Sequence, residues 1–340
     1  MSVVITACAT VSGPVRHQAQ IIGPFDTVTV FIAYAESEAA FNQSANLVFE
    51  RLEELHRLYD IFNAYQDLNN LYTINAQAGI APVGVSVEII DMLTAAREAY
   101  DLTDGRTNAA LGPVLRIWHD YRTRAFEDPE AAQTPSIAVL QEAAAHISMA
   151  DVVIDAGNRT VFLPHQGMSL DVGSVAKGYA AGLAMDAATD AGLEAALLNV
   201  GGHVVALGAP PGREHWNIAI QNPESGQPGA PPAIDSVQLT DAAVSISGAL
   251  QRFYMVDEQI FGHVIDPDTL MPADLFGQVV VIHPVSWLAD VLSTALFVLP
   301  QTEGAELAAI AGAEALWIDL DGNWVATPGY EVISSEIILP

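Results

Sequence analysis

The sequence predicts an α+β fold, a mixed α/β single domain in which antiparallel sheets are flanked by helices. Residues 27–32 are β-branched and alternate in polarity, which is typical of a strand. Residues 37–62 carry apolar side chains at helical spacing. Residues 253–265 read as two short strands joined by a polar turn, which predicts a hairpin. Hydrophobic residues make up 51% of the chain, enough for a sizeable core.

Further elements follow in order along the chain. A second helix is predicted over residues 86–103, with Ser86 as its N-cap and Gly105 as its stop. A short third helix is expected over 136–146, and the polar segment 124–136 with its two prolines predicts a surface loop. Strands and helices therefore alternate throughout the chain.

The first residues stand apart from this pattern. We expect residues 1–20 to form a flexible lead-in and residues 21–340 to form the single domain. The stretch that ends at Cys8 has the form of a bacterial lipoprotein cleavage site, but the segment before it is short and has no basic start. Two interpretations stay open: a remnant of a lipid anchor on an extracytoplasmic protein of the cell membrane, or an accidental match in a cytoplasmic one.

Charge excludes one class of partner. The chain has 41 acidic and 12 basic residues and a formal net charge of -29, so nucleic-acid binding is disfavoured. Lys177 is the only lysine, and the other basic residues are arginines. The single cysteine excludes an intrachain disulfide and a zinc site made of thiolates.

The first candidate site is a glycine turn that leads into a helix. A short strand is predicted to end at Asp171, Gly173 and Ser174 form the turn, and an alanine-rich helix follows to about Ala191. A helix N-terminus with Lys177 one turn in suits a phosphate. The alternative is an ordinary strand-turn-helix in which the glycine allows close packing.

The second candidate site is an apolar helix over residues 286–299, with Ser286 as its expected cap. Asp290, Ser293 and Thr294 are spaced i, i+3, i+4 and therefore share one face. A carboxylate and two hydroxyls are the hard oxygen ligands that Mg²⁺ prefers. In the alternative interpretation, the two hydroxyls bond back to the helix backbone.

The third candidate is His263, at the end of the second strand of the predicted hairpin and before a turn at residues 266–269. A histidine beside acids at a strand end can act as a general base near neutral pH. A structural histidine is the alternative.

These three motifs, in this order and with the segments 216–223 and 245–248 between them, resemble the ApbE family of FAD:protein FMN transferases, also called flavin transferases. The resemblance runs from Phe25 to Leu299. It implies an ApbE-type fold, FAD as substrate and Mg²⁺ as cofactor. It also implies transfer of FMN through a phosphoester bond to a threonine of an acceptor flavoprotein, with release of AMP. Acceptors in the family include subunits of sodium-pumping quinone reductase, Rnf subunits and other extracytoplasmic flavoproteins.

The resemblance also implies roles for individual residues. It makes His263 the general base. The implied metal contacts are Ser174, Asp290, Ser293 and Thr294. The implied FAD contacts are Phe25, Tyr65, Arg106, Thr107, Asn108, Asp171, Lys177 and Ile265.

The chain departs from the family pattern at three places. Phe25-Asp26-Thr27 stands where many members have Met-Gly-Thr, and Asn108 and His203 stand where many have aspartate. Two other functions stay open: an FAD pyrophosphatase that gives FMN and AMP, and a non-catalytic FAD-binding lipoprotein.

Overall fold

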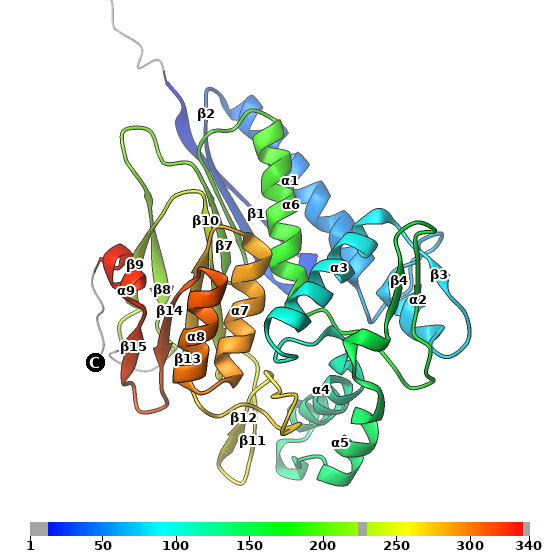
Figure 1. Ribbon diagram of the computed structural model, residues 1–340. Helices are drawn as coiled ribbons and strands as arrows, with labels where there is room; N and C mark the ends of the chain where they lie inside the picture. The colour runs from blue at the N-terminus through cyan, green and yellow to red at the C-terminus, as the bar shows by residue number, and fades with distance from the viewer. Residues whose placement is uncertain (1–12, 224–229, 336–340) are drawn as a thin grey trace, which may run out of the picture.

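An antiparallel sheet of eight strands forms the centre of the computed structural model, which describes residues 13–223 and 230–335 (Figure 1). Its strand order is β1-β2-β6-β7-β10-β13-β14-β15, and every neighbouring pair runs antiparallel. These strands are β1 (Val15–Ile22), β2 (Val28–Ala35), β6 (Ala196–Val200), β7 (His203–Leu207), β10 (Ala242–Gly248), β13 (Gln278–His283), β14 (Glu314–Ile318) and β15 (Trp324–Ala326). The predicted α+β class, with antiparallel sheets and flanking helices, is confirmed.

Three smaller sheets accompany the central one. They are β3-β5-β4, the hairpin β8-β9 and the hairpin β11-β12. Their strands are β3 (Val83–Gly84), β4 (Val153–Asp155), β5 (Thr160–Phe162), β8 (Trp216–Gln221), β9 (Ala233–Leu239), β11 (Tyr254–Val256) and β12 (Gln259–Phe261). The predicted hairpin is confirmed as β11 and β12, but β12 ends at Phe261 instead of Ile265, so His263 lies beyond the strand.

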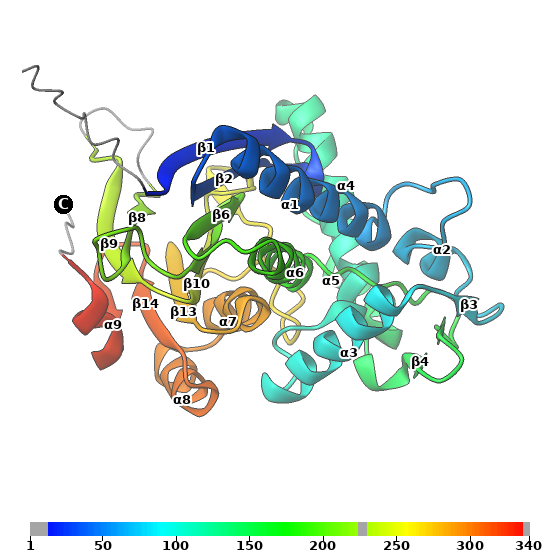
Figure 2. The same cartoon turned by 90° about the horizontal axis from the view of Figure 1, so that it is seen from above.

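Helices cover one face of the central sheet (Figure 2). α1 packs on β1 and β2, α6 on β6 and β7, α7 on β10 and β13, and α8 on β14. The helices are α1 (Glu38–Tyr59), α2 (Leu71–Ala76), α3 (Val87–Leu102), α4 (Gly112–Glu127), α5 (Ile137–Ala143), α6 (Ala176–Asp190), α7 (Ser286–Val298), α8 (Gln301–Ala311) and α9 (Pro328–Ile333). The hairpin β8-β9 and α9 pack against the other face, in a cluster that includes Ile220, Val237 and Tyr330.

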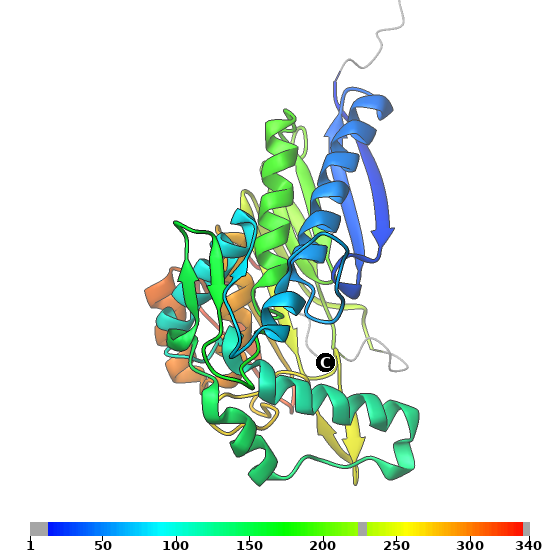
Figure 3. The same cartoon turned by 90° about the vertical axis from the view of Figure 1, so that its right-hand side faces the viewer.

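Local sequence explains the two long helices at the core. In α1, Ser37 accepts a hydrogen bond from the backbone N–H of Ala40 at 3.2 Å, and the predicted apolar stripe is buried. In α6, small residues let the helix approach both α1 and α7 closely. Figure 3 shows α1 and α6 running side by side. Among the described residues no helix is long and apolar enough to cross a membrane.

Several local expectations are wrong. The lead-in cannot extend to residue 20, because β1 begins at Val15 and pairs with β2 along its length. Cys8 lies outside the described residues. The segment before α6 is irregular instead of a strand, and α4 continues to Glu127 into the expected loop. Ser286 is the first residue of α7, and its N-cap is Val285.

Candidate functional site

A cavity of about 1050 Å³ lies where α4, α6 and α7 meet the turns of the central sheet. Its walls come from segments far apart in the chain, from Phe25 to Thr294. Eleven of the thirteen predicted site residues line it: Phe25, Arg106, Thr107, Asn108, Asp171, Ser174, Lys177, His263, Ile265, Asp290 and Thr294. The fold therefore brings the three motifs of the sequence to one place.

Tyr65 is one of the two predicted residues that do not line the cavity. Its hydroxyl donates to Asp60 Oδ2 at 2.8 Å, and the guanidinium of Arg57 lies 4.8 Å from its ring centroid. Asp60 also accepts from the backbone N–H of Phe62 at 2.7 Å, and both Asp60 and Phe62 line the cavity. Tyr65 thus contacts the loop of cavity residues and does not line the cavity itself, and its flavin contact stays a prediction.

Ser293 is the other predicted site residue that does not line the cavity. It is 1% exposed, and its hydroxyl donates to the backbone carbonyl of Asp290 at 2.8 Å. Ser247 Oγ lies 3.0 Å away on β10. The hydroxyl is therefore used within the α7–β10 contact, and the structure separates Ser293 from Asp290 and Thr294, which line the cavity.

Asp290 is the buried carboxylate of the cavity wall, with 4% of its surface exposed. Its Oδ2 accepts from the backbone N–H of Gly178 at 2.8 Å, and its Oδ1 accepts from Ser245 Oγ at 3.2 Å. None of the ion pairs within the described ranges includes Asp290. A buried carboxylate without a cationic side chain favours a bound cation.

Gly178 is required for that contact. A Cβ built on it would lie 2.5 Å from the Cβ of Asp290 and 2.9 Å from the carbonyl oxygen of Ser286. The close approach of α6 and α7 also uses backbone N–H groups of the α6 N-terminus. Those of Val175 and Ala176 donate to Val172, and that of Gly178 donates to Asp290. The helix end is therefore less open to a phosphate than the sequence predicts, and Lys177 is its cationic group on the cavity.

His203 belongs to the same α6–α7 junction. Ser286 Oγ donates its proton to the carbonyl of Gly178 at 2.7 Å, so His203 Nε2, at 2.9 Å, must be the donor to Ser286 Oγ. Burial lowers the pKa of His203 to about 4, which agrees with a neutral ring. His203 does not line the cavity, so this departure from the family pattern has a structural role.

Asp171 lies at the start of the α6 turn. Its backbone N–H donates to the carbonyl of Ala109 at 2.8 Å, and its Oδ1 accepts from the N–H of Gly173 at 2.9 Å. Burial raises the pKa of Asp171, while His119 and Arg122 nearby act in the opposite direction. One carboxylate oxygen remains available for a ligand N–H or hydroxyl group.

His263 follows strand β12 and faces a group of cations. Burial lowers its pKa to about 4, with further lowering by Arg122, Arg252 and Lys177. Its Nδ1 is buried and has no hydrogen-bond partner among the described residues. The ring is therefore neutral at pH 7 and has a free nitrogen, as a general base requires.

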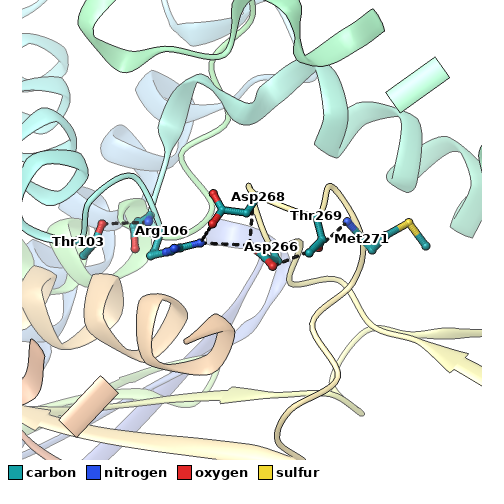
Figure 4. A network of polar contacts seen from close by, with 7 residues as sticks. Thr103, Arg106, Asp266, Asp268, Thr269 and Met271 are labelled. Atoms are coloured by element: carbon teal, nitrogen blue, oxygen red, sulfur yellow. Dashed lines mark hydrogen bonds and ion pairs between the residues drawn. The ribbon is translucent and has the colours of Figure 1, made fainter. Parts of the chain in front are cut away.

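A polar network fixes the loop that follows His263 (Figure 4). Arg106 forms ion pairs with Asp268 and, at 3.7 Å, with Asp266. Thr269 Oγ1 donates to Asp266 Oδ2 at 3.1 Å and accepts from the N–H of Met271 at 3.3 Å. The guanidinium of Arg106 is thus occupied by carboxylates of this loop. These ion pairs connect the segment of His263 and Ile265 to the turn that follows α3.

Thr107 and Asn108 also have structural partners. Thr107 Oγ1 donates to the carbonyl of Val291 at 3.1 Å, which connects this segment to α7. Asn108 Nδ2 donates to the carbonyl of Ile147 at 2.8 Å, and its Oδ1 accepts from the N–H of Ala110 at 2.9 Å. Their side chains are therefore held by protein partners where these residues line the cavity.

Aromatic rings form an apolar part of the wall. Phe25 has a φ of 56°, in the left-handed region, and its N–H donates to His56 Nδ1 at 3.2 Å. Phe62 is 59% exposed and lies 5.4 Å from the ring of His119. Such rings suit the planar face of an aromatic ligand.

A model described as the ApbE family matches residues 26–317. The chain belongs to the ApbE family. The FAD:protein FMN transferase of Treponema pallidum is 33% identical over 83% of this chain and 80% of its own length. That of Klebsiella pneumoniae is 29% identical over 73% of this chain and 76% of its own.

Solved structures of ApbE proteins share the fold. The ApbE protein of Thermotoga maritima matches with a TM-score of 0.82 and 24% identity, over 94% of this chain and all of its own. The apo flavinyl transferase ApbE of Pseudomonas stutzeri matches with a TM-score of 0.78 and 22% identity, over 95% of this chain and 98% of its own.

The donor set of this ApbE-family cavity fits Mg²⁺ better than a transition metal. Within residues 13–223 and 230–335, no group of three or more His, Cys, Asp or Glu side chains could hold a metal. Asp290 supplies one carboxylate, and Thr294 and Ser174 supply hydroxyls on the same cavity. Mg²⁺ is commonly held by one or two carboxylates, with waters and substrate phosphates completing its shell.

The sequence did not indicate all of the ApbE cavity. Five of the twelve basic side chains line it: Arg106, Arg116, Arg122, Lys177 and Arg252. Only Lys177 and Arg106 were expected there. The other three come from α4, which was not predicted, and from the turn before β11. Because basic residues are scarce in this acidic chain, each arginine could have been considered a candidate site residue.

Proposed function

We propose that this chain is an FAD:protein FMN transferase, which moves the FMN half of FAD to a threonine of an acceptor protein and releases AMP. The observation that carries the proposal is the shared cavity of Asp290, Lys177 and His263, a carboxylate, a cation and a neutral base. The relatives from Treponema pallidum and Klebsiella pneumoniae that are named FAD:protein FMN transferases support it. The acceptor is a flavoprotein, of the Rnf or sodium-pumping quinone reductase type or another extracytoplasmic protein.

Asp290, Thr294 and Ser174 are the residues that would hold Mg²⁺ in this cavity. When bound, the metal neutralises charge on the diphosphate of FAD and makes AMP a better leaving group. Lys177 binds the diphosphate oxygens from the α6 side. The aromatic wall of Phe25 and Phe62 packs against the flavin rings, and Asp171 accepts a hydrogen bond from FAD.

His263 takes the proton of the threonine hydroxyl. The threonine oxygen forms a bond to the phosphorus of the FMN phosphoryl group, and the bond from that phosphorus to the AMP oxygen breaks. The proton is then held on His263, and AMP leaves with the negative charge. Because the pKa of His263 is about 4, the base is unprotonated throughout the neutral range.

A transfer assay tests this function directly. The protein is incubated with FAD, Mg²⁺ and a threonine-containing acceptor peptide, and the denatured peptide is examined for flavin fluorescence and for an added FMN mass. We expect a labelled threonine peptide, an unlabelled alanine peptide and one AMP for each label. Release of free FMN and AMP without label would support the FAD pyrophosphatase instead. FAD binding without any turnover would support a non-catalytic flavin-binding lipoprotein.

Replacement of His263 separates binding from chemistry. We expect His263→Gln to slow transfer about 100-fold, a typical contribution of a general base, with a much smaller effect on the Kd for FAD. In the wild type, lowering the pH protonates His263 and removes the base. Since its pKa is about 4, this acid loss should occur well below pH 6.5. An unchanged rate in His263→Gln would contradict the assignment.

The membrane anchor belongs to the same proposal. If Cys8 carries lipid, the enzyme faces the extracytoplasmic side of the cell membrane, where flavoproteins of this kind are found. Cys8→Ser would then release the protein from membranes, whereas unchanged partitioning between membrane and soluble fractions would show that Cys8 carries no lipid anchor.

A further inference from the structure

Two arginines of the cavity have no task in the chemistry described so far. Arg122 lies on α4, and Arg252 lies in the turn between β10 and β11. β11 packs against α4, which brings their segments together (Figure 1). Both line the cavity with His263, and the charge of each lowers the pKa of that histidine. Two like charges therefore share the cavity with the base.

These guanidinium groups lack an acidic partner, although the chain has 41 acids. In the described part of the chain, the ion pairs involve only Arg51 and Arg106 among the arginines. Arg122 Nη2 instead lies 3.2 Å from His119 Nδ1. Asp171 is near enough to attract Arg122 electrostatically, but it does not form an ion pair with it. Two arginines that share one cavity wall without acidic partners repel each other, and an anion bound in the cavity stabilises them.

Partial burial of Arg122 raises the energetic cost of leaving its charge without an anionic partner. Burial lowers the pKa of Arg122, and the charge of Arg252 lowers it further. Arg252 is exposed, so an anion can reach the pair from solvent. Arg122 and His119 are three residues apart on α4 and therefore share the face that lines the cavity. Arg122 and Arg252 therefore both belong to the cavity wall. The wall is open to solvent at Arg252.

FAD already has its own cationic groups. In the proposed function, Lys177 of α6 and the metal that Asp290 of α7 would hold bind its diphosphate, and these helices contribute neither arginine. The acceptor polypeptide must enter from solvent and bring its hydroxyl to His263. The surface it meets has a formal net charge of -29, so an acidic segment is repelled except where basic groups gather.

We propose that Arg122 and Arg252 form a subsite that binds an acidic side chain next to the target threonine of the acceptor protein. This inference rests on the proposed transfer function and adds a specificity to it. A carboxylate bound there would pair with both guanidinium groups and fix the register of the acceptor segment over His263. It would also offset the positive potential that the arginines impose on the base.

Two acceptor peptides test the subsite. They are identical except that all positions within three residues of the threonine carry aspartate in one and asparagine in the other. The wild type, Arg122→Gln, Arg252→Gln and the control Arg124→Gln are compared by KM and kcat for each peptide and by the Kd for FAD. Arg124 is exposed on α4 and does not line the cavity.

We expect the wild type and Arg124→Gln to show a KM about 10-fold lower for the aspartate peptide, as charge-assisted hydrogen bonds predict. In Arg122→Gln and Arg252→Gln this preference should largely disappear, while the KM for the asparagine peptide and the Kd for FAD change little. Equal KM values for both peptides in the wild type would overturn the subsite. A loss of FAD affinity that matches the loss of activity would overturn it as well, because the pair would then hold the diphosphate of FAD.

Binding measurements keep this result separate from the transfer function. If the wild type modifies neither peptide, the proposed transfer to threonine fails. Fluorescence anisotropy of the labelled peptides on the FAD-loaded protein then decides the subsite by the same charge preference. Tighter binding of the aspartate peptide that is lost in both arginine variants supports the subsite, and equal binding of the two peptides refutes it.

Discussion

Asp290→Asn is expected to reduce FMN transfer about 100-fold or more, a barrier increase of about 2.7 kcal/mol. The substitution keeps the size of the side chain and a carbonyl oxygen that can accept from the N–H of Gly178. It removes the only charged group of the proposed metal-binding set, and the diphosphate then meets the threonine hydroxyl without the compensating cation. The rate is measured as a function of Mg²⁺ concentration, together with the melting temperature.

Ser293→Ala is the matched control on the same helix. Its hydroxyl contacts the carbonyl of Asp290 and Ser247 and does not reach the cavity, so most of the transfer rate should be kept. If the two variants lose the same activity at the same metal concentration, α7 acts by packing alone, and Asp290 is not the metal ligand.

Gly178→Ala is expected to damage both stability and activity. The new Cβ would overlap the Cβ of Asp290 at 2.5 Å and approach the Cα of Trp287 at 3.0 Å, so α6 and α7 must move apart. Such overpacking costs about 1–3 kcal/mol of unfolding free energy. The shift also breaks the contact between the N–H of Gly178 and Asp290, and transfer should fall with it. Urea unfolding and the transfer rate report the two effects.

Gly182→Ala, one turn further along α6, supplies the comparison. Its Cβ would lie 3.3 Å from the Cβ of Ser286, a contact that a small shift relieves. Alanine also has the higher helix propensity, so stability should change little or rise slightly. A Gly178→Ala protein as stable and active as Gly182→Ala would show that the α6–α7 contact is looser than described.

Periodicity predicted the elements that bury one face. The stripe of α1 and the alternation of β2 are direct consequences of packing against the core, so they are visible in the sequence. α4 was missed although Val114, Trp118 and Ala125 are buried at helical spacing, because charged residues interrupt that pattern. Its cavity side mixes Leu115 and Trp118 with arginine and histidine, so the apolar stripe is incomplete there.

The metal helix shows the limit of spacing arguments. Successive helix residues are rotated by about 100°, so Ser293 and Thr294 lie on opposite sides of Asp290, about 100° apart. Both count as neighbours of Asp290 in sequence, but only one side faces the cavity. The packing of β10 against α7 selects Thr294, and that packing cannot be derived from the helix alone. The place of Tyr65 outside the cavity lining is likewise set by tertiary contacts, because its hydroxyl donates to Asp60.

The cavity residues are spread widely along the chain, and this determines when the cavity can form during synthesis. The wall begins at Phe25 and is completed by Asp290 and Thr294, and β2 finds its sheet neighbour β6 only at Ala196–Val200. During synthesis, the early helices and strands must therefore wait for most of the chain before the ligand cavity can exist. FAD can therefore bind, and add stability, only after most of the chain has been made.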